Sequence, residues 1–197
     1  MNKLCTSISD LFSRINGHHI GVCIKFLTYS NKFKNRPKVL TLVRDKKSQI
    51  KRKSLNKDKT DHWLDENSDF DFIYANFDDD NIETSYYYKT LLPFRKNYKN
   101  TRLKKWPPKT RNIIFNLIER FRKWPLKYKS TLVVPIVPLE ANEQEKSALR
   151  GFLCIDSPRN IAFNKNIDTD ILKFISDGLY NVIDKLYTLK KDKNEKS

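Results

Sequence analysis

The sequence predicts an α+β fold in which one antiparallel sheet is covered by the N- and C-terminal helices on one face and by variable middle segments on the other. Two pairs of strand-like segments, within residues 20–44 and 130–156, predict the sheet. Helical patterns at both ends of the chain and a less regular middle, residues 45–125, predict the two layers around it. Elements of this kind pack in layers because each has to bury one apolar face.

The first quarter of the chain predicts a helix followed by a hairpin. Residues 2–16 carry apolar side chains at helical spacing, namely Leu4, Ile8, Leu11, Phe12 and Ile15. Gly17 then favours the end of this helix. Residues 20–29 alternate as a strand does, with Ile20, Val22, Ile24 and Phe26 on one side, and residues 38–44 form a second strand-like run. We expect the two strands to pair antiparallel.

The middle of the chain predicts less regular structure. Residues 45–61 are polar and mostly basic, which indicates a long exposed loop. Asn67 or Ser68 is a candidate cap for a short helix whose inner face is Phe70, Ile73, Tyr74 and Phe77. Residues 86–92 are compatible with a strand or with irregular structure, and residues 93–108 indicate a loop.

The second half of the chain predicts a helix and another hairpin. Residues 109–123 have helical spacing and lie between Pro108 and Pro125, which favour helix ends. Residues 130–138 and 151–156 are short apolar runs, and we expect them to pair as strands.

The last element predicted is a long amphipathic helix. Asp168 or Thr169 is expected to cap this helix, which runs to about Leu189. We expect residues 1–189 to form a single domain and residues 190–197 to be a disordered charged tail.

The formal net charge of +16 is distributed unevenly along the chain. Residues 1–60 and 86–130 are strongly basic, residues 61–85 carry nine acidic and no basic residues, and the last third is neutral. Basic blocks of this kind attract nucleic acid or anionic surfaces, although a solvated Lys-rich surface also explains them.

Cysteine usage and hydropathy indicate a cytoplasmic protein. The three cysteines, Cys5, Cys23 and Cys154, are odd in number and far apart, which favours free buried thiols in a reducing compartment. No apolar run approaches the ~20 residues that cross a bilayer, and the N-terminus has no signal-peptide pattern.

The last third of the chain carries a recognisable pattern. STLVVPIVP, a polar turn and RGFLCIDSPRNIAF precede the long helix. The positions that carry the pattern are Pro135, Ile136, Gly151, Leu153, Asp156, Ser157, Phe163, Asp170, Leu172 and Asp177. This pattern resembles the closing half of GAF domains, a family of small-molecule sensor domains. The resemblance follows the order of elements over residues 2–187, whereas residues 45–125 match poorly.

The resemblance implies a five- or six-stranded antiparallel sheet with a pocket between the sheet and the middle segment. It favours a regulatory sensor or binding module for an unidentified small molecule, which signals through dimerisation or through a partner protein. It also implies a homodimer formed by the terminal helices. Aromatic and polar side chains of the middle segment suit such a pocket. The candidate ligand-binding residues are Asn67, Phe70, Tyr74, Tyr86, Tyr88, Tyr98 and Arg102.

No catalytic residue is predicted, so we expect the protein not to be an enzyme. Some GAF-like proteins reduce free methionine sulfoxide, and GFLCIDSP resembles the end of one of their strands. However, Cys154 lies inside an apolar strand, whereas a reactive thiol needs an exposed electropositive site.

No metal or cofactor is predicted either. Adjacent residues of a strand face opposite ways, so His18 and His19 do not suit a shared metal, and His62 is isolated. The scattered glycines form no phosphate-binding loop.

Two alternative functions remain open. The first is a basic nucleic-acid or anionic-surface binding protein, which requires one contiguous basic face. That face would contain Lys46, Lys47, Lys51, Arg52, Lys53, Lys104, Lys105, Arg111, Arg120, Arg122 and Lys123. The second is a structural dimerisation module with no ligand, which requires a large apolar face and no cavity.

Overall fold

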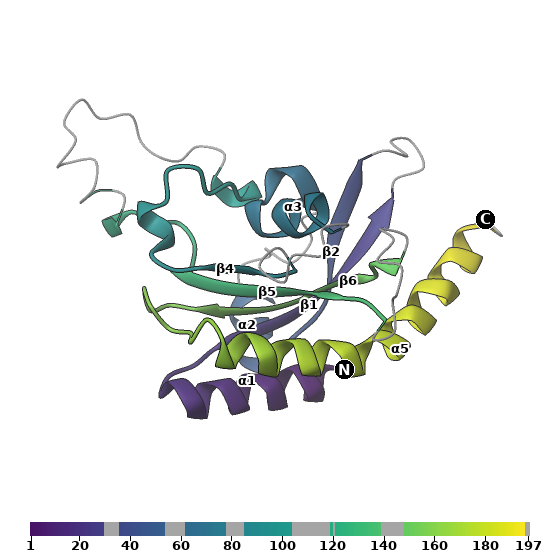
Figure 1. The fold of residues 1–197 in the computed structure, drawn as a ribbon, viewed down its shortest axis with the longest axis horizontal. Helices are drawn as coiled ribbons and strands as arrows, with labels where there is room; N and C mark the ends of the chain where they lie inside the picture. The colour runs from purple at the N-terminus through teal and green to yellow at the C-terminus, as the bar shows by residue number, and fades with distance from the viewer. Residues whose placement is uncertain are drawn as a thin grey trace.

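A single six-stranded antiparallel sheet organises the chain. The computed structural model describes residues 1–29, 36–53, 62–77, 85–103, 119, 121–138 and 148–195; the side chains of residues 51–53 and 190–195 are outside this description. The strand order is β3-β2-β1-β6-β5-β4 (Figure 1). The strands are β1 (Gly21–Tyr29), β2 (Pro37–Arg44), β3 (His62–Trp63), β4 (Tyr87–Lys89), β5 (Ser130–Ile136) and β6 (Gly151–Ser157).

Both expected hairpins are confirmed. β1 pairs antiparallel with β2, and β5 pairs antiparallel with β6. β6 also lies beside β1, with Gly21 opposite Asp156 and Phe26 opposite Gly151, so the two hairpins form one sheet. The segment left open at residues 86–92 contains β4, a short strand that pairs with β5.

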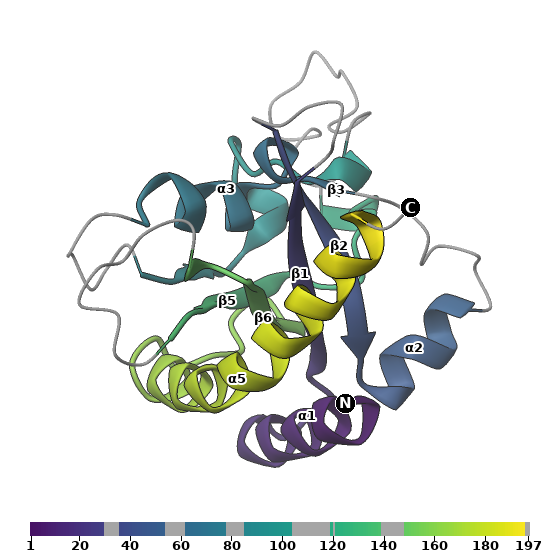
Figure 2. The ribbon, with the colours of Figure 1, turned by 90° about the vertical axis from the view of Figure 1, so that its right-hand side faces the viewer.

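The terminal helices cover one face of this sheet and the middle segments cover the other. α1 (Asn2–Asn16) and α5 (Ile167–Glu195) lie on the same side in both views, and α3 (Ser68–Ala75) lies opposite them (Figures 1 and 2). Short 3-10 helices at Leu64–Glu66, Leu92–Phe94 and Thr101–Leu103 accompany α3. This arrangement confirms the predicted fold class.

The two faces of the central strands form two separate cores because strand side chains alternate. Val22, Ile24 and Phe26 of β1 belong to the cluster beneath α1 and α5. Cys23 and Leu27 belong to the cluster beneath α3. Since both faces of β1 and β6 are buried, these strands are the centre of the domain.

A helix replaces part of the loop expected at residues 45–61. α2 (Lys46–Lys53) begins directly after Asp45, whose carboxylate accepts hydrogen bonds from the backbone N–H of Ser48 (2.8 Å) and of Val22 (2.9 Å). The first bond caps the helix and the second ties it to β1. The expectation of a loop was wrong because residues 46–53 contain a single apolar side chain, Ile50, and so show no apolar helical spacing.

The long C-terminal helix begins slightly earlier than expected. The Asn164 side-chain oxygen accepts hydrogen bonds from the N–H of Asn166 and Ile167, so Asn164 caps the helix. The Asp168 carboxylate bonds back to the Asn164 N–H at 2.7 Å. α5 then continues past Leu189 to Glu195, and the domain limits given above stay predictions.

Some sequence expectations fall outside the described residues. They include most of the helix at residues 109–123, the connection at residues 139–147 and the last two residues. Among the helices that the structure describes, none is both long enough and apolar enough to span a membrane.

Candidate functional site

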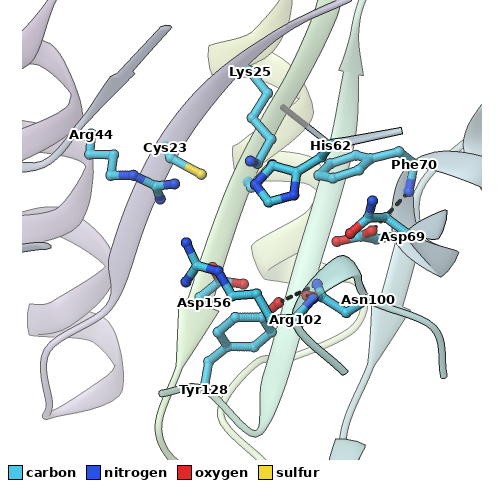
Figure 3. Close-up of a pocket in the computed structure, with 12 residues that line it drawn as sticks. Cys23, Lys25, Arg44, His62, Asp69, Phe70, Asn100, Arg102, Tyr128 and Asp156 are labelled. Atoms are coloured by element: carbon cyan, nitrogen blue, oxygen red, sulfur yellow. Dashed lines mark hydrogen bonds between the residues drawn. The ribbon is translucent and has the colours of Figure 1, made fainter. Parts of the chain in front are cut away.

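A small cavity of about 40 Å³ lies on the middle-segment face of the sheet (Figure 3). That volume accommodates a few water molecules or a very small ligand without rearrangement. Its lining residues come from β1, β2, β6 and the middle segments. They are Cys23, Lys25, Arg44, His62, Asn67, Asp69, Phe70, Asn100, Arg102, Tyr128, Cys154 and Asp156.

The floor of the cavity is formed by side chains of β1 and β6 that alternation directs to the same face of the sheet. Cys23 and Lys25 are two residues apart on β1, so they point to the same face. Cys154 and Asp156 have the same relationship on β6, and Cys154 lies opposite Cys23. Polar and sulfur-containing side chains therefore meet at the centre of the sheet, where a purely structural core would place apolar groups.

A β-bulge brings two further groups to this face. The pairing of β1 with β2 shifts between Ile24 and Lys25, because Ile24 lies opposite Val43 and Lys25 lies opposite Thr41. The shift places Thr41 and Arg44, three residues apart, on the same face as Lys25 and Cys23. The Thr41 hydroxyl consequently accepts hydrogen bonds from both Lys25 Nζ (3.2 Å) and Arg44 Nη2 (3.1 Å).

The cavity contains buried charges. The side chains of Lys25, Arg44 and Asp69 are each less than one-tenth exposed. Burial raises the pKa of the Asp69 carboxyl to about 6, although the positive charge of Lys25 and the hydrogen bond from the Phe70 N–H oppose the shift. Lys25 Nζ lies 5.4 Å from the centre of the Phe70 ring, which adds a cation–π contact.

Amide side chains hold the outer wall in place. Asn67 donates to the carbonyl of Trp63 (2.7 Å) and to the Thr101 hydroxyl (2.9 Å), and it accepts from the Thr101 N–H (3.2 Å). Asn100 donates to the Tyr128 hydroxyl at 3.1 Å and accepts from the Arg102 N–H. These bonds connect the start of α3 to the segment that carries Arg102.

A second cavity of about 130 Å³ adjoins the first. The two share Cys23, Arg44, Tyr128 and Asp156, and the second is lined further by His19, Gly21, Val22, Ser48, Lys127 and Pro158. Movement of the shared side chains would join the two spaces into a larger pocket.

The structure brings together three of the predicted site residues. Asn67, Phe70 and Arg102 line the cavity. Tyr74 packs against the same apolar cluster without lining the cavity, and Tyr98 is buried in that cluster with its hydroxyl 3.3 Å from the Tyr128 hydroxyl. A ligand-binding role for these residues stays a prediction.

Tyr86 and Tyr88 occupy the opposite face, which corrects their expected position in the pocket wall. Both pack in the cluster beneath α5, and the Tyr88 hydroxyl donates to the Phe163 carbonyl at 2.9 Å. Tyr87, between them, faces the cavity side. Because the sequence left residues 86–92 open between a strand and irregular structure, it did not fix the face on which these side chains lie.

Sequence reasoning missed most of the charged lining. Lys25 interrupts an otherwise apolar strand that is buried on both faces, and that interruption was the available signal. Asp69 is one of the nine acidic residues within residues 61–85, and it is buried beside Phe70 on the inner side of α3.

The predicted basic surface is described only in part. Lys46, Lys47, Arg122 and Lys123 are exposed. The remaining side chains proposed for that surface are not among those described, so a contiguous basic face stays a prediction.

Comparison with known proteins supports a GAF-like fold. A type II free methionine-R-sulfoxide reductase from Thermoplasma acidophilum is similar to this chain, with a TM-score of 0.53 and 14% identity over 93% of this chain and 92% of that chain. The GAF domain of an Acinetobacter phosphoenolpyruvate-protein phosphotransferase is similar with a TM-score of 0.52 and 9% identity, over 95% and 84% of the two chains. No family model matches the sequence, and no curated protein matches it significantly. The chain therefore has a GAF-like fold.

The same comparison corrects the expectation that the protein is not an enzyme. A structure with this fold and nearly equal length is that of a reductase, so the fold does not exclude catalysis. The expectation was wrong because it treated GAF-like architecture and an isolated strand cysteine as grounds for excluding an activity.

Proposed function

We propose that the protein is a GAF-type binding module whose cavity takes a small molecule with an anionic group. The observation that carries this proposal is the burial of Lys25, Arg44 and Asp69 around a cavity at the centre of the sheet. Burying charged groups costs stability unless they are well paired, and packing the fold does not require them here. Such groups are common where a protein recognises a polar ligand.

The charge balance favours an anion. The lysine and arginine side chains of the lining are Lys25, Arg44 and Arg102, and the lining carboxylates are Asp69 and Asp156. Asp156 already accepts a hydrogen bond from the Thr131 hydroxyl at 2.8 Å. A carboxylate or phosphate group on the ligand would complement the excess of positive charge.

A thermal-shift screen tests this proposal. We expect inorganic phosphate or one of a panel of small carboxylates to raise the melting temperature, whereas neutral analogues of the same size do not. A compound that binds only the folded protein stabilises it by about 2.7 kcal/mol at 100 times its Kd.

Two lysine variants localise the effect. Lys25→Met should weaken binding of the same anion by about 10- to 100-fold, because it removes a charged contact. Lys173→Met is the matched control: Lys173 is a half-buried residue of α5, on the opposite face of the sheet, where it donates to the Ser85 hydroxyl, and its loss should leave binding unchanged. If the anion raised the melting temperature of the wild type, Lys25→Met and Lys173→Met equally, the proposed site would be contradicted.

Dimerisation through the terminal helices is the proposed route of signalling. α5 carries an apolar stripe with residues spaced seven or eight apart, which returns to one side of the helix. Its members, Ile167, Phe174, Val182 and Leu189, are 58%, 80%, 49% and 60% exposed. Leu4, Leu11 and Ile15 extend the exposed apolar surface on α1. A second copy of the chain would cover both stripes.

Analytical ultracentrifugation tests this interface. We expect the wild-type protein to sediment as a dimer and Phe174→Asp as a monomer with an unchanged far-UV circular dichroism spectrum. Ile50→Asp, which changes an exposed apolar residue of α2 outside the stripe, should remain dimeric. A wild-type monomer at all concentrations would argue against signalling by dimerisation.

A further inference from the structure

Two cysteines face each other across the floor of the cavity. Cys23 of β1 and Cys154 of β6 are directly paired in the antiparallel register, and both line the cavity. Residues opposite each other in such a pair have Cα atoms about 4.5–5.5 Å apart, which falls inside the range that a disulfide bond spans. The backbone therefore already holds the two residues at bonding range.

The two thiols also contact each other. Cys23 and Cys154 are free thiols that share a hydrogen bond. The third cysteine, Cys5, belongs to the core on the opposite face of the sheet, beneath α1, and does not line the cavity. The chain thus contains an adjacent thiol pair next to a cavity and a buried thiol away from it.

We propose that Cys23 and Cys154 form a redox-active dithiol, which a small hydroperoxide that enters the cavity oxidises to a reversible disulfide. In the first step, one sulfur attacks a peroxide oxygen, the O–O bond breaks, and a sulfenic acid forms while the peroxide leaves as water or an alcohol. The second sulfur then attacks the sulfenic sulfur, and the S–S bond forms as water leaves. The two thiols lose two protons and two electrons, and the peroxide accepts them.

The cavity beside the two thiols is only about 40 Å³ in volume, which limits the reaction to small oxidants, and burial slows it. Burial raises the pKa of the Cys154 thiol well above its usual range, and the hydrogen bond with Cys23 raises it further, while the charge of Lys25 opposes the shift. A thiol whose pKa is raised reacts more slowly than an exposed thiolate. The proposal does not depend on the identity or existence of the anionic ligand.

Mass spectrometry of the wild-type protein tests the proposal. The reduced protein is treated with hydrogen peroxide under native conditions, and we expect its intact mass to fall by about 2 Da, the loss of two hydrogens. Trypsin cleavage without reductant should then give one species that links residues 15–25 to residues 151–159. Dithiothreitol should separate the two peptides again.

Matched variants assign the bond. Cys5→Ser should lose the same mass as the wild type, whereas Cys154→Ser should lose none. A urea-denatured sample, oxidised in parallel, shows that the linked peptides are detectable. The proposal is overturned if the native protein yields only sulfinic or sulfonic acids, stays reduced under conditions that link the denatured chain, or links Cys5 as often as Cys154.

Discussion

Replacing Gly151 with Ala is expected to destabilise the protein by about 3 kcal/mol or more, because overpacking a rigid strand interface forces the backbone to move. A Cβ atom at this position would lie 1.9 Å from the Lys25 carbonyl oxygen and 3.0 Å from its carbon, both backbone atoms of β1. Gly151 pairs with Phe26 in the centre of the sheet, so neither strand can easily shift. Chemical denaturation followed by circular dichroism measures the loss.

The matched control is Gly178→Ala. Gly178 lies within α5, and a Cβ atom there would have no neighbour within 4 Å. Alanine has the higher helix propensity, so this variant should gain up to about 1 kcal/mol. If both variants had the same effect, the close approach of β6 to β1 would not be the cause of the loss.

Asp69→Asn is expected to have the opposite sign and to stabilise the protein at neutral pH. Burial raises the pKa of Asp69 from 3.8 to about 6, so the folded protein holds this proton more tightly than the unfolded chain. Between these two values the wild-type protein loses stability as pH rises, because folding then disfavours the charged form. The stability of the asparagine variant does not fall with pH in this range, because its side chain does not ionise. Above pH 6 it should therefore be more stable than the wild type by up to about 3 kcal/mol.

Unfolding of both proteins between pH 4 and pH 8 measures this difference. The difference in free energy of unfolding between the two proteins should be small near pH 4, increase up to about pH 6 and stay constant above it. If the free energy of unfolding had the same pH dependence in both proteins, the ionised Asp69 carboxylate would not destabilise the folded state. Because the variant also removes one of the two carboxylates that line the cavity, it should bind anions more tightly than the wild type.

The regular elements were predictable from the sequence because their patterns are local. Alternation in residues 20–29 and the apolar stripe of α5 follow from strand and helix geometry alone. α2 was not predictable in this way, because residues 46–53 contain a single apolar side chain, Ile50, and so carry no apolar stripe. A polar and basic segment without such a stripe indicates a loop.

The candidate site was harder to predict because it depends on register. Asn67 and Phe70 were found through the short helix that carries them, and the structure places both at the cavity. Arg44 reaches the same face through the shift in pairing beside Lys25, which no spacing in the sequence reveals. Tyr86 and Tyr88 lie on the other face of the sheet, and the sequence did not fix their face because it left open whether residues 86–92 form a strand.

Chemical-shift mapping of a ¹⁵N-labelled sample tests most directly whether the charged cavity is the binding site. The probe is the phosphate or carboxylate that gives the largest increase in melting temperature. We predict the largest amide shifts around Lys25, Asp69 and Cys154, which line the cavity, and small shifts along α1. Shifts confined to the terminal helices, with none on the cavity side of β1 and β6, would contradict the assignment.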